Sequence, residues 1–241
     1  LIGFAPEEAG EFLVSVFSSL SPDMAGMIEA AFRDGWIDFY PREGKSGGAF
    51  CAEAGCLEES RILTNFSGSF GSVVTLAHEL GHAYHGQQIQ NHRPLNTGYT
   101  MPVAETASNF NELIIVNDAI AKSEGEEKIQ LIESQLQDCT QIIVDIYSRF
   151  LFEDEVIRRR KNTFLFAKDL EEIMINAQKE AYGDGLDPET LHPYMWCCKS
   201  HYYSAGLSYY NFPYAFGGLF SRGLYAKYLE EGEAFLPKYR A

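Results

Sequence analysis

The sequence predicts a mainly α-helical fold with a small antiparallel β-sheet, and three observations lead to this prediction. Two amphipathic runs near the N-terminus each begin with proline, two later runs alternate like half-buried strands, and from Ser72 onward most apolar residues recur at helical spacing. Of the 241 residues, 46% are hydrophobic, which is enough for a substantial core. We expect one domain spanning residues 1–241.

The first two helices are expected to begin at Pro6 and Pro22. Proline suits the first helical position because the N–H that it lacks would have no helical partner there, and Ser21 can cap the second helix. Residues 36–40 and 61–66 read as strands, separated by a glycine-rich loop at 41–50. Two short strands joined in this way predict a small sheet, which we expect to be antiparallel.

Residues 126–160 predict a long helix with one apolar stripe. We expect the stripe to be buried within this domain, and a coiled-coil partner is the alternative. The stripe consists of Ile129, Ile132, Leu136, Cys139, Ile143, Ile146 and Phe150.

Net charge and cysteine content exclude several classes of protein. A formal charge of −15 repels nucleic acid and anionic membranes, so neither is expected as a partner. No apolar run is long enough to span a membrane. The 5 cysteines are odd in number and two are adjacent, which is unlike a disulfide framework. We therefore expect reduced thiols and a cytoplasmic location.

Residues 75–88, "TLAHELGHAYHGQQ", contain the pattern H-E-x-x-H at His78, Glu79 and His82. Residues four apart lie on one face of a helix, so the two histidines can bind one metal ion together, and Glu79 can reach a metal-bound water from the flank. Two imidazoles and a carboxylate, with one position open for water, favour Zn²⁺. The alternative is a helix with ordinary surface histidines.

The third ligand is sought further along the chain. Gln88 occupies the position, six residues after His82, that a third histidine would need. The stretch "MPVAETASNFNE", 101–112, instead offers Glu105 and Glu112, two turns apart on one helix face. We assign Glu105 to the metal and Glu112 to a hydrogen bond that orients a metal-binding histidine. For Glu112, an ordinary solvated acid remains the alternative.

"LAHELGHAYH" followed by "AETASNFNE" resembles the oligoendopeptidase F branch of the thimet-oligopeptidase-like zinc metallopeptidases. "KSGGAFC", "SRILTNFSGSFGSVVTLAHELGH" and "LHPYMWCCKSHYYSAGLSYYNFPYAFG" resemble other segments of that branch, so the match runs from residue 46 to about residue 230. The resemblance implies a helical zincin-type catalytic domain that hydrolyses internal amide bonds of short, unstructured peptides. It implies His78, His82 and Glu105 as ligands of one zinc ion.

The same resemblance implies that Glu79 is the general base that activates the zinc-bound water. It also implies hydrogen-bond donors for the transition state in the C-terminal segment, because the oxyanion needs donors besides the metal. We assign this role to His201, Tyr203 and Tyr210, and Tyr214 is the alternative tyrosine. For many of the tyrosines in this segment, packing is the alternative role.

Members of this branch are longer than this chain and have an N-terminal portion that walls the other side of a substrate channel. We therefore expect this chain to be the C-terminal catalytic part of a longer peptidase, with zinc bound but weak turnover of peptides in isolation.

Two other functions remain open. A metallocarboxypeptidase would need a cation such as Arg93 to bind the free C-terminus, and a non-catalytic zinc- or peptide-binding domain would have no need of Glu79.

Overall fold

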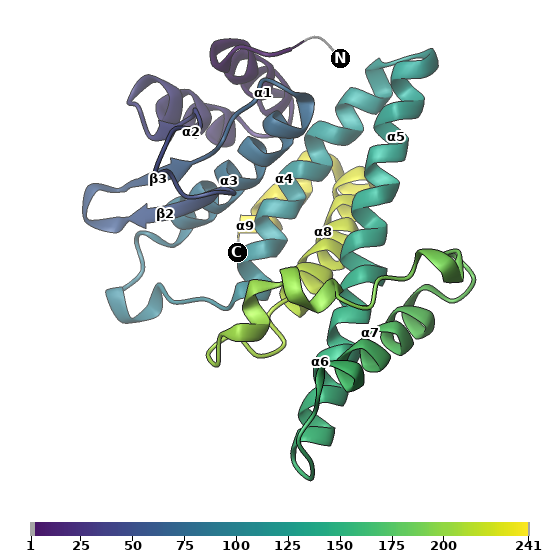
Figure 1. Cartoon of the computed structure of the whole chain (residues 1–241). Helices are drawn as coiled ribbons and strands as arrows, with labels where there is room; N and C mark the ends of the chain where they lie inside the picture. The colour runs from purple at the N-terminus through teal and green to yellow at the C-terminus, as the bar shows by residue number, and fades with distance from the viewer. Residues whose placement is uncertain (1–2, 241) are drawn as a thin grey trace. The chain divides into compact units, whose positions relative to one another are not determined.

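The computed structural model describes residues 3–240, which divide into two compact units. The first unit comprises residues 3–132 and 217–240, and the second comprises residues 133–216. The helices are α1 (Pro6–Leu20), α2 (Pro22–Arg33), α3 (Phe70–Ile89), α4 (Met101–Lys122), α5 (Gly125–Thr140), α6 (Ile146–Arg160), α7 (Ala167–Tyr182), α8 (Phe212–Glu231) and α9 (Leu236–Arg240) (Figure 1). The strands are β1 (Ile37–Asp38), β2 (Phe50–Ala54) and β3 (Glu59–Leu63). The predicted mainly helical fold with a small sheet is confirmed.

The first two helices begin at the residues that the sequence indicates. Pro6 and Pro22 occupy first-turn positions, and the Ser21 hydroxyl accepts a hydrogen bond from the Met24 N–H at 3.4 Å. Each helix buries its apolar stripe, and Leu13, Phe17 and other buried side chains join the core of the first unit. Sequence capping therefore fixes where these helices start, and amphipathicity fixes which face they bury.

The sheet is mixed, which corrects the expectation of a wholly antiparallel one. Its strand order is β1-β3-β2. The short turn between β2 and β3 makes that pair antiparallel, with Cys51 opposite Ile62. β1 pairs with the other edge of β3 in parallel, with Ile37 opposite Ile62. The chain from β1 passes through β2 before it returns as β3, so β1 can run in the same direction as β3.

α3 packs against both the sheet and α4, and this packing positions the candidate site (Figure 1). The two helices approach each other closely at Gly81, where an added Cβ would lie 2.8 Å from the Ser108 Cα and 2.9 Å from the Ala107 carbonyl oxygen. Only a residue without a side chain allows this spacing. The H-E-x-x-H helix therefore lies directly on the helix that carries Glu105 and Glu112.

The second unit has a core of its own between α6 and α7. Phe152, Leu165, Ile173, Met174 and Ala177 are buried in it, and Trp196 and Tyr202 pack against them. α5 and α6 are joined by a π-helical turn, η3 (Gln141–Asp145). Residues 183–211, between α7 and α8, form turns and short 3₁₀ helices instead of longer helices.

The predicted helix over residues 126–160 is present as α5, η3 and α6, but the expected burial of its stripe is largely wrong. Ile146 is 6% exposed, whereas Ile129 is 58%, Leu136 61% and Phe150 43% exposed. Leu131, which lies off the stripe, is buried. Over residues 3–240, no helix is long and apolar enough to cross a membrane, and the cysteines form no disulfide with one another.

Candidate metal centre and active site

The structure brings together the three side chains predicted to bind a metal. His78 and His82 lie one turn apart on α3, with ring centroids 4.9 Å apart, and Glu105 lies on α4. One ligand atom from each of the three lies within 4.8 Å of those of the other two. Among the described residues, this is the group of three or more side chains whose spacing suits a metal ion. Two imidazole nitrogens and one carboxylate match the donor set that Zn²⁺ prefers.

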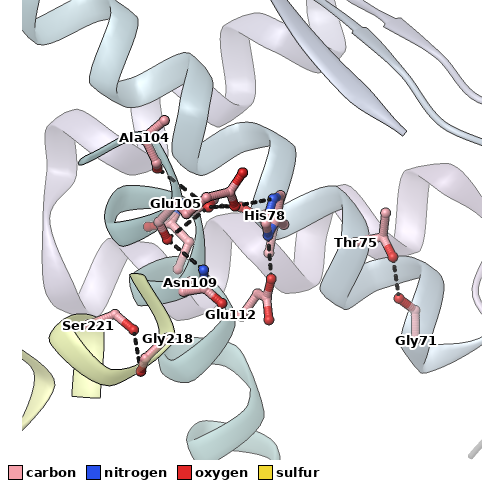
Figure 2. A network of polar contacts seen from close by, with 12 residues as sticks. Gly71, Thr75, His78, Ala104, Glu105, Asn109, Glu112, Gly218 and Ser221 are labelled. Atoms are coloured by element: carbon pink, nitrogen blue, oxygen red, sulfur yellow. Dashed lines mark hydrogen bonds and ion pairs between the residues drawn. The ribbon is translucent and has the colours of Figure 1, made fainter. Parts of the chain in front are cut away.

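Glu112 lies where it can orient one of these histidines. Figure 2 shows His78 on α3 between Glu105 and Glu112, which both come from α4. The Nδ1 atom of His78 is hydrogen-bonded to the Glu112 carboxylate, and its Nε2 atom lies 3.5 Å from a Glu105 oxygen. A histidine whose Nδ1–H donates to a carboxylate presents the lone pair of Nε2 to a metal. The geometry thus favours Nε2 of His78 as the ligand atom.

Glu79 is 5% exposed and its Oε2 atom has no hydrogen-bond partner among residues 3–240. Burial raises the pKa of this carboxyl to about 7, with further contributions from the negative charges of Glu105 and Glu112 and an opposing one from His78. A carboxyl group with a pKa near neutrality can both accept and return a proton. The Oε2 atom of Glu79 makes no hydrogen bond with residues 3–240, so this oxygen is available to accept a proton.

The histidines respond in opposite directions to the same surroundings. Burial alone lowers the pKa of His78, but the hydrogen bond and charge of Glu112, with the charges of Glu105 and Glu79, raise it to about 9. Burial lowers the pKa of His82 to about 3, and the neighbouring His78 and His85 add to this effect. Glu79 and Glu105 are both buried close to His78. A divalent cation would compensate the negative charge of these carboxylates. The residues present therefore fit a metal ion.

Two hydrogen bonds within α4 hold the side chain and the backbone of Glu105. Ser108 donates to a Glu105 carboxylate oxygen at 3.2 Å. Asn109 donates to the Glu105 carbonyl at 2.6 Å (Figure 2). Gly217, at the start of α8, approaches so closely that a Cβ there would lie 2.7 Å from the Glu105 Cβ. Asn111 is fully buried and donates to the Ala77 carbonyl of α3 at 3.3 Å.

These supporting residues were not identified from the sequence. Their signal was present, since Ser108, Asn109 and Asn111 fall within "AETASNFNE" between glutamates at helical spacing. A run of polar residues on a helix that is otherwise apolar indicates buried hydrogen bonding. Which partner each one bonds depends on how α3 packs against α4.

The predicted donors His201, Tyr203 and Tyr210 lie in the second unit. His201 is buried on a short 3₁₀ helix (Ser200–Tyr203), and its Nε2 atom is hydrogen-bonded to Asn211 at 2.8 Å. Tyr203 is 66% exposed. The hydroxyl of Tyr210 is hydrogen-bonded to that of Tyr214 at 3.0 Å, and the ring of Tyr210 lies 5.9 Å from that of His201. The ring of Tyr210 thus lies beside that of His201 while its hydroxyl bonds to Tyr214, and the side chain of Tyr203 makes no hydrogen bond with residues 3–240.

The sequence of this chain is similar to those of known peptidases. The chain is 25% identical to oligopeptidase PepF of Bacillus subtilis over 236 residues, which are 97% of the chain and 35% of that protein. It is 33% identical to an oligoendopeptidase F homolog of Mycoplasma genitalium over 131 residues, 54% of the chain and 21% of the relative. The chain thus spans about a third of the length of the Bacillus subtilis relative.

Solved structures share the fold. A crystal structure from Chlamydophila abortus superposes with a TM-score of 0.80 at 23% identity over 99% of this chain and 40% of that one. PZ peptidase A, solved with an inhibitor, superposes with a TM-score of 0.78 at 17% identity over 98% of this chain and 42% of that one. The model of peptidase family M3 matches residues 18–239. The chain belongs to peptidase family M3, in its oligoendopeptidase F branch.

Proposed function

We propose that this chain is the catalytic portion of a zinc-dependent endopeptidase that hydrolyses internal amide bonds of short, unstructured peptides. The observation that carries the proposal is the grouping of His78, His82 and Glu105 beside the unpartnered carboxylate oxygen of Glu79. Membership of peptidase family M3 supports the same reaction class. We propose further that residues 1–241 form one catalytic domain and that an N-terminal portion of the same enzyme completes the channel.

Each candidate site residue of the first unit has a separate role in this proposal. His78, His82 and Glu105 would hold one zinc ion, and Glu112 would fix the ring of His78 through its Nδ1–H. Zinc bound there would supply Lewis acidity and lower the pKa of a coordinated water. Glu79 would take a proton at Oε2 from the attacking water and pass it to the nitrogen of the leaving amine.

We assign the hydrogen-bond donors of this mechanism to residues of the C-terminal segment. Negative charge builds on the scissile carbonyl oxygen during attack, and preorganised donors stabilise it. His201, Tyr203 and Tyr210 are the residues that we assign to this task. The contact of His201 with Asn211 and that of Tyr210 with Tyr214 would hold two of them in fixed orientations.

The outer edge of β2 is the proposed site for the substrate backbone. β2 is an edge strand, because β3 is its partner on one side and no described strand lies on the other. Extended peptides commonly add to such an edge through main-chain hydrogen bonds. A structure with a bound peptide tests this directly, and a peptide that makes no backbone hydrogen bond to residues 50–54 would contradict it.

The first experiment is hydrolysis of an internally quenched peptide that is blocked at both ends. Glu79→Gln removes the base without changing its size, and Glu29→Gln, on the exposed face of α2, is the matched control. At equal zinc occupancy we expect Glu79→Gln to lower kcat by about 10²- to 10⁴-fold and the control to leave it unchanged. Equal activity in both variants would contradict the assignment.

The same experiment separates the other functions. A carboxypeptidase would cleave only after the C-terminal block is removed, whereas an endopeptidase cleaves the blocked peptide. One bound zinc per chain without any cleavage would favour the non-catalytic alternative. In that case, cleavage restored by the N-terminal portion of a relative would return the chain to the endopeptidase class.

A further inference from the structure

A continuous chain of buried polar contacts leads to His201 within the second unit. It begins at Asp145, the last residue of the π-helical turn η3, whose carboxylate is hydrogen-bonded and ion-paired to Arg149 one helical turn later. The Tyr182 hydroxyl donates to the other Asp145 oxygen at 3.3 Å. Asp145 and Arg149 thus form a pair that is shielded from solvent, with side chains only 13% and 11% exposed. Such a pair holds the guanidinium in one orientation.

Arg149 determines how the next residue is oriented. Its Nη1 atom donates to the Asn211 side chain at 2.8 Å. A guanidinium has donors only, so the Asn211 atom that faces it must be the carbonyl oxygen. The amide nitrogen of Asn211 therefore points the other way, toward Nε2 of His201 at 2.8 Å. Arg149 removes the ambiguity between the two ends of the amide.

The orientation of Asn211 in turn determines the protonation of His201. An amide nitrogen only donates, so Nε2 of His201 has to accept, and the neutral ring carries its proton on Nδ1. Nδ1 makes no hydrogen bond with any residue from 3 to 240. Burial lowers the pKa of His201, and the positive charges of Arg149 and Lys199 act in the same direction, which favours the neutral ring.

The backbone at both ends of this series of polar contacts has features that are typical of functional sites. η3 is a π-helical turn. Such turns are rare in proteins, and those that occur are often found at functional sites. Tyr209, two residues before Asn211, has a φ of 55°, a left-handed conformation that costs free energy for a residue other than glycine. Its N–H donates to Glu153 at 2.8 Å and its hydroxyl to Asp154 at 2.9 Å. These contacts to α6 hold the turn that presents Asn211.

We propose that Asp145, Arg149 and Asn211 are positioning residues that hold His201 as its Nδ1–H tautomer, so that Nδ1 is the atom that donates to the substrate carbonyl. This inference rests on the proposed function of His201 and adds the donor atom and the residues that select it. Sequence spacing gives no sign of it, because the three positioning residues are separated by up to 66 positions and meet only in the folded unit.

The test combines a spectrum with kinetics, using the full chain with zinc bound. Long-range ¹H–¹⁵N spectra report which ring nitrogen carries the proton for each of the 6 histidines, and His201→Gln assigns the relevant signals. Asn211→Asp is nearly isosteric, but its carboxylate only accepts, so neutral His201 must move its proton to Nε2. Asn162→Asp, an exposed change in the same unit, is the matched control for charge.

We expect the unaltered chain to show the Nδ1–H tautomer and Asn211→Asp to show Nε2–H. Loss of one preorganised donor should lower kcat about 10²-fold with little change in KM. The ratio of variant to unaltered activity should rise as the pH falls, because a doubly protonated ring donates from both nitrogens again.

An Nε2–H tautomer in the unaltered chain would overturn the proposal without any activity measurement. A tautomer change in Asn211→Asp without a fall in kcat would also overturn the positioning role. Failure of the proposed function looks different, since the unaltered chain would then show the Nδ1–H tautomer but cleave no blocked peptide. Arg149→Lys provides a second variant, because a single ammonium cannot bridge Asp145 and Asn211, and mixed tautomers are expected.

Discussion

Gly81 allows the close contact between α3 and α4, the two helices that carry the candidate metal ligands. Adding a Cβ there would place it 2.8 Å from the backbone of Ser108, and backbone cannot move aside as a flexible side chain can. We expect Gly81→Ala to lower the free energy of unfolding by about 1–3 kcal/mol. Zinc affinity should fall as well, because α3 and α4 must separate and Glu105 moves away from His78. Urea unfolding and zinc titration measure the two effects.

Gly26 is the matched control for that substitution. It lies in α2 with nothing within 4 Å of an added Cβ. Alanine is favoured over glycine in a helix, so Gly26→Ala should raise the free energy of unfolding by about 0.5–1 kcal/mol. If both substitutions stabilised the chain, the close approach of α3 and α4 at Gly81 would be contradicted.

Glu112 offers a second prediction for a single residue. Its carboxylate is hydrogen-bonded to Nδ1 of His78 and would make Nε2 a better donor to the proposed zinc ion. Glu112→Gln keeps a hydrogen-bond acceptor but removes the negative charge, and we expect zinc affinity to fall on the order of 10- to 100-fold. Competition with a chelator measures the affinity. Glu126→Gln, an exposed substitution in the first turn of α5, should leave it unchanged.

Individual elements differ in how much of their apolar surface they bury. Phe152 of α6 is 4% exposed within the core of the second unit, whereas Leu136 of α5 is 61% exposed. Phe152→Ala should lower stability by about 3–5 kcal/mol, because it leaves a cavity as well as losing buried surface. Leu136→Ala should change it by no more than about 0.5 kcal/mol. Hydrogen exchange of the α6 and α7 amides measures both, and equal effects would contradict the burial pattern.

The elements also show where sequence reasoning succeeds and where it stops. Helix starts at Pro6 and Pro22 are local properties of the chain, so the sequence predicts them. The apolar stripe over residues 126–160 predicts a helix correctly but not its burial. Periodicity determines which residues share a face, while burial depends on whether another element covers that face.

Metal removal is the prediction that concerns the whole molecule. A ligand that binds only the folded chain stabilises it by about 2.7 kcal/mol at 100 times its Kd, so a chelator should lower Tm. The two units have separate cores, and the candidate ligands all lie in the first. Loss of hydrogen-exchange protection should therefore centre on α3 and α4 and spare α7. Equal loss in both units would show that they unfold together.

The sequence by itself determined the helical class, the first helix starts and the pairing of His78 with His82, because each depends on residues a few positions apart. The tertiary structure decided that β1 runs parallel to β3, that Glu105 lies 3.5 Å from His78, and that Asn211 connects Arg149 to His201. These outcomes depend on contacts between segments far apart in the chain. Such contacts are selected by packing and buried hydrogen bonds, which no local pattern specifies.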